Sequence, residues 1–149
     1  MKEGYEYTPA GQISRTIDGN GNAVQYRYNS LGKVSERTDQ LGFTETFRYD
    51  EEGNLSLHID RDGRQLQRAC NVFGQPVYEK ASDAEGKHTN ISTWHYDSLG
   101  RVTRAVCDGK SYEYIYDAYG NLKEKRSNGK RLVSYTHDRA GQITEIRDP

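Results

Sequence analysis

The fold follows from a short element that reads YDSLGRV at residues 96–102. Tyr96 ends an alternating segment, Asp97 and Gly100 are turn residues, and Val102 opens the next apolar series. An Asp side chain accepts hydrogen bonds from nearby backbone N–H groups, and Gly adopts the left-handed conformation that such turns require. The element therefore predicts a strand, a tight turn and a second strand.

The same element occurs seven times along the chain. Its copies read YTPAG at 7–11, YNSLG at 28–32, YDEEG at 49–53, CNVFG at 70–74, YDSLG at 96–100, YDAYG at 116–120 and HDRAG at 137–141. The spacings between copies are 21, 21, 21, 26, 20 and 21 residues, which is typical of a repeat array. The signature positions, to which we assign a structural role, are Tyr7, Gly11, Tyr28, Gly32, Tyr49, Gly53, Cys70, Gly74, Tyr96, Gly100, Tyr116, Gly120, His137 and Gly141.

A second turn follows each of the first six copies after about ten residues. It reads DGNG at 18–21, DQLG at 39–42, DRDG at 60–63, DAEG at 83–86, and then DG at 108–109 and NG at 128–129. The last two favour two-residue type I′ hairpins, which need positive φ at both positions. Thirteen of the 15 glycines fall in the two sets of turns, leaving Gly4 and Gly19. Apolar and polar residues alternate between the turns, as in a half-buried strand.

We therefore expect an all-β fold of tandem β-hairpin repeats of about 21 residues. The hairpins form a continuous antiparallel sheet, and because strands twist right-handedly we expect it to be curved or spiralling. Residues 1–149 read as a single array of about seven repeats, cut from a longer repeat region. The fourth repeat, around 70–95, is irregular, because Cys70 replaces Tyr, Pro76 replaces an apolar residue and five residues are inserted. We expect a bulge or longer loop around 79–91.

The composition favours an ordered chain with a thin core. Leu, Ile, Val and Phe make up about 17% of the residues, a share that is typical of disordered chains when net charge is high. The net charge here is only -1, and 12 Tyr supply additional bulk. Each aromatic ring can bury about 150 Å² while its hydroxyl remains hydrogen-bonded. We expect one tyrosine-rich face and one polar face on the sheet.

Charge and hydropathy exclude several classes of partner. Lys and Arg are interspersed with Asp and Glu, so we expect no nucleic-acid partner. No apolar run approaches the roughly 18 residues of a membrane span, so we expect no membrane insertion. Two cysteines, Cys70 and Cys107, are too few for a disulfide framework, and whether they pair is open.

The sequence offers no pattern typical of a catalytic, cofactor or metal site. The stretch DGNGN at 18–22 matches the start of a calcium loop, but Ala23 and Asn29 replace its required Gly and Glu. No Ser or Cys has a recognisable nucleophile motif. The histidines, which fall at unrelated positions of the repeat, are His58, His88, His95 and His137. We expect a protein that is not an enzyme and has no cofactor.

The combination of Y-D-x-x-G-[NKRQ]-[LVI], D-x-x-G and Y-x-Y resembles the YD repeat of the Rhs family, also called the RHS repeat, over essentially the whole chain. The resemblance implies a large secreted or cell-surface parent, as in Rhs and wall-associated polymorphic toxins, insecticidal toxin complexes and teneurins. Repeats of this family form a spiralling sheet that closes into a hollow shell. In bacterial members the shell encloses a C-terminal toxin.

Two functions follow as hypotheses. The first is a non-enzymatic shell segment whose partners are adjacent repeats and a C-terminal cargo domain, with self-association through exposed edge strands. The second is a cell-surface carbohydrate-binding or adhesion module that stacks glycans on exposed aromatic rings. The candidate rings are Tyr26, Tyr28, Tyr49, Trp94, Tyr96, Tyr112, Tyr114 and Tyr116. If these rings instead pack between neighbouring strands, the first function is favoured.

Overall fold

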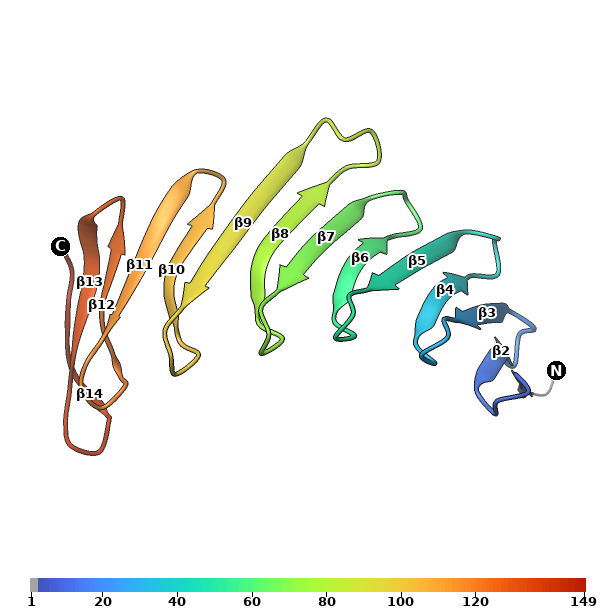
Figure 1. Cartoon of the computed structure of the whole chain (residues 1–149), viewed down its shortest axis with the longest axis horizontal. Helices are drawn as coiled ribbons and strands as arrows, with labels where there is room; N and C mark the ends of the chain where they lie inside the picture. The colour runs from blue at the N-terminus through green and yellow to red at the C-terminus, as the bar shows by residue number, and fades with distance from the viewer. Residues whose placement is uncertain (1–2) are drawn as a thin grey trace. The chain divides into compact units, whose positions relative to one another are not determined.

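A computed structural model describes residues 3–149, in which fourteen β-strands follow one another in sequence order in one antiparallel sheet (Figure 1). The strands are β1 (Gly4–Tyr7), β2 (Ile13–Ile17), β3 (Ala23–Tyr28), β4 (Val34–Thr38), β5 (Thr44–Tyr49), β6 (Leu55–Ile59), β7 (Gln65–Cys70), β8 (Pro76–Ser82), β9 (Thr89–Tyr96), β10 (Val102–Cys107), β11 (Lys110–Tyr116), β12 (Leu122–Ser127), β13 (Lys130–His137) and β14 (Ile143–Arg147). The predicted all-β fold of tandem hairpins is confirmed. Across the described residues, no helix is long and apolar enough to cross a membrane.

The chain divides into two compact units. Unit 1 comprises Met1–Gly74 and Lys80–Thr89, and unit 2 comprises Gln75–Glu79 and Asn90–Pro149. Strands β1 to β7 belong to unit 1, and β10 to β14 belong to unit 2. Each unit is a run of antiparallel hairpins, so its fold is set by local turns and by the pairing of neighbouring strands.

The turns that lead from an odd-numbered strand to the next even-numbered strand, called YD turns below, share one geometry. In the turn after β9, the Gly100 N–H donates to the Asp97 carbonyl over 3.0 Å, and the Asp97 N–H donates to the Arg101 carbonyl over 2.9 Å. The Asp97 carboxylate accepts the N–H groups of Leu99 and Arg101 at 3.0 and 2.9 Å. Gly100 has a φ of 79°, a left-handed value that glycine adopts without strain. Asp and Gly therefore fix the hairpin locally.

The two shorter turns have the predicted type I′ conformation. The φ values are 48° and 78° at Asp108 and Gly109, and 48° and 77° at Asn128 and Gly129. Asn128 also extends the sheet, because its N–H donates to the Ser111 carbonyl over 3.0 Å while its Oδ1 accepts the Ser111 N–H over 3.2 Å. The thirteen glycines with positive φ are the thirteen assigned to turns from the sequence.

The core is thin, as the composition predicts. Ala105, at 5% exposure, is the one hydrophobic residue of the described chain that is buried. It lies between Trp94 on β9 and Tyr112 on β11. The chain exposes 10471 Å², whereas a globular monomer of this size exposes about 7,700 Å². Both faces of the sheet thus retain surface that a second layer would cover in an ordinary domain.

The fourth repeat differs from its predicted form. Instead of a loop over 79–91, the structure has a turn from Asp83 to His88, closed by the Asp83 N–H donating to the His88 carbonyl over 3.1 Å. The neighbouring residues belong to β8 and β9, which have 7 and 8 residues. The insertion adds residues to both strands of one hairpin, so the hairpin lengthens and its turn gains a single residue.

Candidate functional site

The signature positions lie together along the YD turns. Each signature Tyr, or the residue that replaces it, is the last residue of an odd-numbered strand, and each signature Gly follows within the next turn. The first of these positions are Tyr7 at the end of β1 and Gly11 in the turn after it. The repeat therefore places the signature position at the same point of every hairpin.

The signature Tyr bonds to the preceding repeat. In unit 1, the Tyr28 hydroxyl donates to the Ile13 carbonyl over 2.6 Å, and the Tyr49 hydroxyl donates to the Val34 carbonyl over 2.9 Å. Unit 2 has the same contacts, which run from Tyr96 to Pro76 over 2.7 Å and from Tyr116 to Val102 over 2.7 Å. The acceptor is always the residue two positions after the preceding signature Gly. Each bond therefore joins two repeats.

A second contact runs in the opposite direction, from the residue directly after the signature Gly to the next repeat. The Gln12 Nε2 donates to the Gly32 carbonyl over 2.8 Å, and the Lys33 Nζ donates to the Gly53 carbonyl over 2.7 Å. In unit 2, Gln75 bonds to Gly100 in the same way over 2.8 Å. This contact and the tyrosine hydroxyl bond are together called the repeat clip.

Cations add to the clip by covering the tyrosine rings. Lys33 Nζ lies 5.0 Å from the centroid of the Tyr49 ring, and the Arg101 guanidinium lies 4.5 Å from that of Tyr116. Such contacts contribute about 0.5–1 kcal/mol at exposed sites. Both cations directly follow a signature Gly, so one side chain position supplies the polar contact and the ring contact to the next repeat.

The clip gives the signature glycines a second role beyond backbone conformation. A Cβ at Gly32 would lie 3.2 Å from the Gln12 Nε2, and one at Gly53 would lie 3.1 Å from the Lys33 side chain. By contrast, Gly42, which lies in a turn at the other end of the strands, has no atom within 4 Å of such a Cβ. Glycine at the YD turn therefore leaves space for the neighbouring repeat.

Two copies lack the phenol hydroxyl. Cys70 ends β7 as a free thiol. His137 ends β13 with its side chain only 9% exposed, and its Nδ1 lies 3.9 Å from the Asp117 carboxylate of the previous YD turn. These two copies keep the signature Gly and its turn, so the hairpin forms without the tyrosine hydroxyl.

Carboxylates in the turns are held ionised by hydrogen bonds. Backbone N–H donation from Arg101 lowers the pKa of Asp97, and the Asn22 side-chain amide lowers that of Asp18. The Asn54 amide lowers the pKa of Asp50 in the same way, and the His88 ring lowers that of Asp83. These carboxylates bind the turn backbone itself, which agrees with their predicted role in turn formation.

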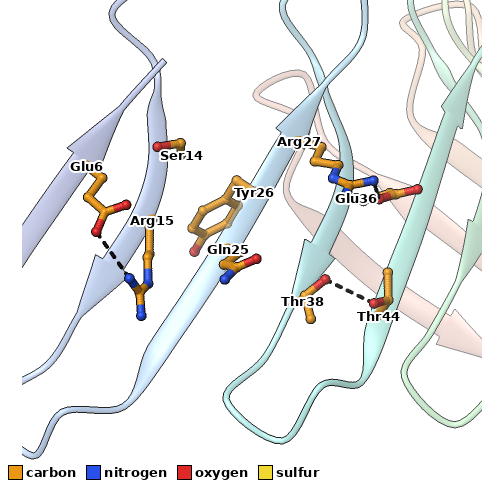
Figure 2. A pocket seen from close by; sticks show the side chains of 9 residues that line it. All are labelled: Glu6, Ser14, Arg15, Gln25, Tyr26, Arg27, Glu36, Thr38 and Thr44. Carbon is orange, nitrogen blue, oxygen red and sulfur yellow. Dashed lines mark hydrogen bonds and ion pairs between the residues drawn. The ribbon is translucent and has the colours of Figure 1, made fainter.

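A hollow of about 590 Å³ lies over β1 to β5 of unit 1 (Figure 2). Its walls include two ion pairs, Glu6 with Arg15 and Arg27 with Glu36, each at 3.2 Å. Gln25, Tyr26 and the hydrogen-bonded pair Thr38 and Thr44 complete much of the lining. Within residues 3–149, no group of three or more His, Cys, Asp or Glu side chains is placed to hold a metal ion. The hollow is thus a polar surface with both charges and one aromatic ring.

The aromatic side chains that are candidates for glycan stacking are mostly half-buried. They include Tyr28, Tyr49, Tyr96 and Tyr116, which bond to backbone carbonyls through their hydroxyls. The residues after the signature Gly were missed as contact residues in the sequence. A signal was present, because all seven copies carry a polar side chain there: Gln12, Lys33, Asn54, Gln75, Arg101, Asn121 and Gln142.

Comparison with known proteins gives one family and one fold. The model of the RHS Repeat matches residues 7–44, 28–65 and 116–149. None of the curated proteins matches the sequence significantly.

Solved structures with the same fold include a Photorhabdus luminescens Tc holotoxin pore, with a TM-score of 0.76 and 14% identity over 97% of this chain and 9% of that chain. TcdB2-TccC3-Cdc42 gives 0.68 and 14%, and TcdB2-TccC3 gives 0.67 and 13%, each over 95% of this chain and 9% of the other. The chain therefore spans about 9% of the length of these structures.

Proposed function

Because the chain belongs to the RHS repeat family, we propose that it is a non-enzymatic wall segment of a shell that encloses or presents a separate C-terminal domain. Its partners in this role are adjacent repeats and that cargo domain. The parent would be a large secreted or cell-surface protein. The toxin-complex structures with the same fold support this proposal at the level of architecture.

The repeat clip is the observation that supports a wall function best. Tyrosine hydroxyls and the residues after the signature glycines are engaged with the neighbouring repeat. A neutral hydrogen bond contributes about 1 kcal/mol, so several clips give a steady increment of stability for each repeat added. Side chains that bond to the neighbouring repeat serve to extend the sheet, which is the role of a wall segment.

The large exposed surface supports the same role. A single-layer sheet leaves both faces accessible, and a wall needs one face toward an interior and one toward solvent. A domain that functions alone normally covers one face of its sheet with a second layer.

Limited proteolysis of the full-length parent tests the proposal. We expect the domain after the repeats to resist protease in the native parent and to become sensitive when four clip tyrosines are replaced by Phe. The replaced residues are Tyr28, Tyr49, Tyr96 and Tyr116. Tyr5 and Tyr119, which are 59% and 85% exposed, provide the matched Tyr→Phe control. Equal cleavage of the domain in the native parent and in isolation would contradict enclosure.

One observation favours a second function, carbohydrate binding at the hollow in Figure 2. Amide, hydroxyl, guanidinium and carboxylate groups beside a ring can hydrogen-bond sugar hydroxyls and stack on a sugar face. A glycan array with the purified chain tests it, with Gln25→Ala and Thr38→Ala as variants that remove lining groups. Absence of binding, or binding that both variants retain in full, rules this function out.

A further inference from the structure

The chain contains two Asn-Gly pairs, and both lie in exposed turns. Asn20 and Gly21 lie between β2 and β3, and Asn128 and Gly129 lie between β12 and β13. An Asn-Gly pair deamidates more readily than other Asn pairs, because glycine has no side chain that hinders attack of its nitrogen on the asparagine amide. Both pairs have this intrinsic reactivity, so any difference between them comes from their surroundings.

The attacking nitrogen is held at Gly21 and is free at Gly129. The Gly21 N–H donates to the Asp18 carbonyl over 2.9 Å. Within residues 3–149 no acceptor lies on the Gly129 N–H, because a two-residue type I′ turn leaves this group outside the ladder. A Cβ at Gly129 would have no atom within 4 Å, and both residues of this turn are exposed, so water reaches the peptide.

The charges around the two pairs are opposite in sign. The one charged residue within three positions of Asn20 is Asp18, whose carboxylate accepts the Asn20 N–H over 2.8 Å. Attack requires the glycine nitrogen to lose its proton, and nearby positive charge favours the resulting anion, whereas a carboxylate opposes it. All the charged residues within three positions of Asn128 are cations, namely Lys125, Arg126, Lys130 and Arg131.

The neighbouring strand polarises the Asn128 amide. Its Oδ1 accepts the Ser111 N–H over 3.2 Å, and this donor can stabilise the negative charge that develops on the oxygen during attack. Glu124 neutralises Arg126 at 2.6 Å, but the other three cations near Asn128 remain. From these contacts we propose that Asn128 is a site of spontaneous deamidation and that the turn around Asn20 protects its own Asn-Gly pair.

The reaction needs only water as a second reactant. The Gly129 nitrogen attacks Cγ of Asn128, so that an N–Cγ bond forms, the Cγ–Nδ2 bond breaks, and Nδ2 leaves as ammonia with the proton from the glycine nitrogen. Water then opens the succinimide ring. Cleavage of the N–Cγ bond gives aspartate in an ordinary backbone. Cleavage at the other carbonyl gives isoaspartate, in which the backbone runs through Cβ and Cγ.

The two products have different consequences for the sheet. Asp108 shows that such a turn accepts aspartate, because its N–H donates to the Ile91 carbonyl and its carboxylate accepts the Ile91 N–H, each over 3.0 Å. Isoaspartate adds a backbone carbon to a turn of two residues, which breaks the pairing of Ser127 with Lys130. Deamidation at Asn128 therefore opens the β12–β13 hairpin in the molecules that form isoaspartate.

This inference is independent of the proposed wall function. To test it, the purified chain is incubated at mildly alkaline pH, and peptide mapping by mass spectrometry measures the deamidated fraction at each site over time. We expect Asn128 to react at least about fivefold faster than Asn20, which corresponds to about 1 kcal/mol in the barrier. In guanidinium chloride, which unfolds the chain and screens its charges, the two rates should converge. Equal rates in the folded chain, faster reaction at Asn20, or a ratio that persists in guanidinium chloride would overturn the proposal.

Asn128→Asp is the matched variant for the structural consequence, since it equals one product of the reaction. We expect it to unfold at the same urea concentration as the native chain, whereas the isoaspartate form, separated by chromatography, should unfold at a lower one. If Asn128→Asp loses as much stability as the isoaspartate form, the new charge and not the longer backbone opens the hairpin, and this part of the proposal is wrong.

Discussion

At the scale of single residues, the signature tyrosine has two roles, one for its ring and one for its hydroxyl. The ring is placed by strand alternation, but the hydroxyl reaches the carbonyl of a residue in the preceding repeat, as from Tyr116 to Val102 over 2.7 Å. Burial raises the pKa of Tyr116, so the phenol stays protonated and remains a donor at neutral pH. Loss of the hydroxyl should therefore weaken the contact between repeats while the hairpin keeps its turn.

Tyr116→Phe tests this role. We expect the free energy of unfolding to fall by about 1 kcal/mol, because the Val102 carbonyl loses a hydrogen bond at a partly buried site. The measurement is urea denaturation followed by circular dichroism. Tyr119→Phe is the control, since this ring is 85% exposed, and it should leave the unfolding midpoint unchanged. A similar loss in both variants would show that the clip hydroxyl has no special role.

Cys70 offers the converse experiment, because it occupies a signature position without a hydroxyl. In the repeat that precedes Cys70, the residue that corresponds to the acceptor Val102 is Leu55, two residues after Gly53. We expect Cys70→Tyr to raise the free energy of unfolding relative to Cys70→Phe by about 1 kcal/mol, since the two variants differ by one hydroxyl. Equal stability of these two variants would mean that the fourth repeat cannot form the clip.

At the scale of elements, local hydrogen bonds form each hairpin. Longer-range contacts then join each hairpin to the neighbouring hairpins. Asp97 and Gly100 fix their turn through bonds within five residues. The clip joins residues 14 to 25 positions apart. The two kinds of interaction meet at the signature Gly, which adopts a left-handed φ and also leaves space for a side chain of the preceding repeat.

Gly32→Ala and Gly42→Ala separate these two functions of glycine at opposite ends of β4. Both glycines have left-handed φ, 74° and 84°, so each substitution should cost about 1–2 kcal/mol of stability. Gly32→Ala should cost about 1 kcal/mol more, because its Cβ would lie 3.2 Å from the Gln12 Nε2 and displace that donor.

The double variant Gly32→Ala, Gln12→Ala provides the check on this interpretation. Once the clip is lost, removing the Gln12 side chain should produce little further destabilisation. Thermal unfolding of the three variants and the native chain measures the differences. Equal losses for Gly32→Ala and Gly42→Ala would indicate that only backbone conformation matters.

The sequence was sufficient to predict strands and turns because both depend on local rules. Alternation at period two and the Asp, Asn and Gly residues of each turn indicated the hairpins, and the glycines with positive φ are those expected. The clip was not predicted in full, because a polar residue after Gly, such as Gln12 or Lys33, has many possible partners. The length of β8 and β9 was also missed, since an insertion can extend a hairpin as easily as its loop.

At the scale of the whole molecule, stability depends on many small interactions of similar strength. No large apolar cluster dominates, since Ala105 is the one buried hydrophobic residue of the described chain. Turn carboxylates, clips and cross-strand pairs such as Arg37 with Glu45 at 3.1 Å recur along the sheet. A change that acts on every repeat at once should therefore have a large combined effect, even where each contribution is small.

Acid provides such a change. The pKa values of Asp18, Asp50, Asp83 and Asp97 are lowered below the ordinary 3.8, chiefly by hydrogen bonds to the carboxylates. A lowered pKa means that the unfolded chain binds more protons in acid than the folded chain does. The stabilisation is therefore complete above 3.8 and is lost as the pH falls through the lower pKa values of the folded state.

We expect the urea midpoint to be constant from about pH 7 to pH 5 and to fall steeply below about pH 4. Moderate salt should weaken the charged pairs of Asp97 with Arg101 and of Asp83 with His88, but it should leave the hydrogen bonds from backbone N–H groups to these carboxylates in place. Asp97→Asn is the matched variant, because Asn already fills the equivalent positions 29 and 71. It keeps the acceptor oxygen without a titrating group, so its midpoint should fall less between pH 5 and pH 3 than that of the native chain. A pH dependence that is identical in the variant would mean that Asp97 does not contribute to acid sensitivity.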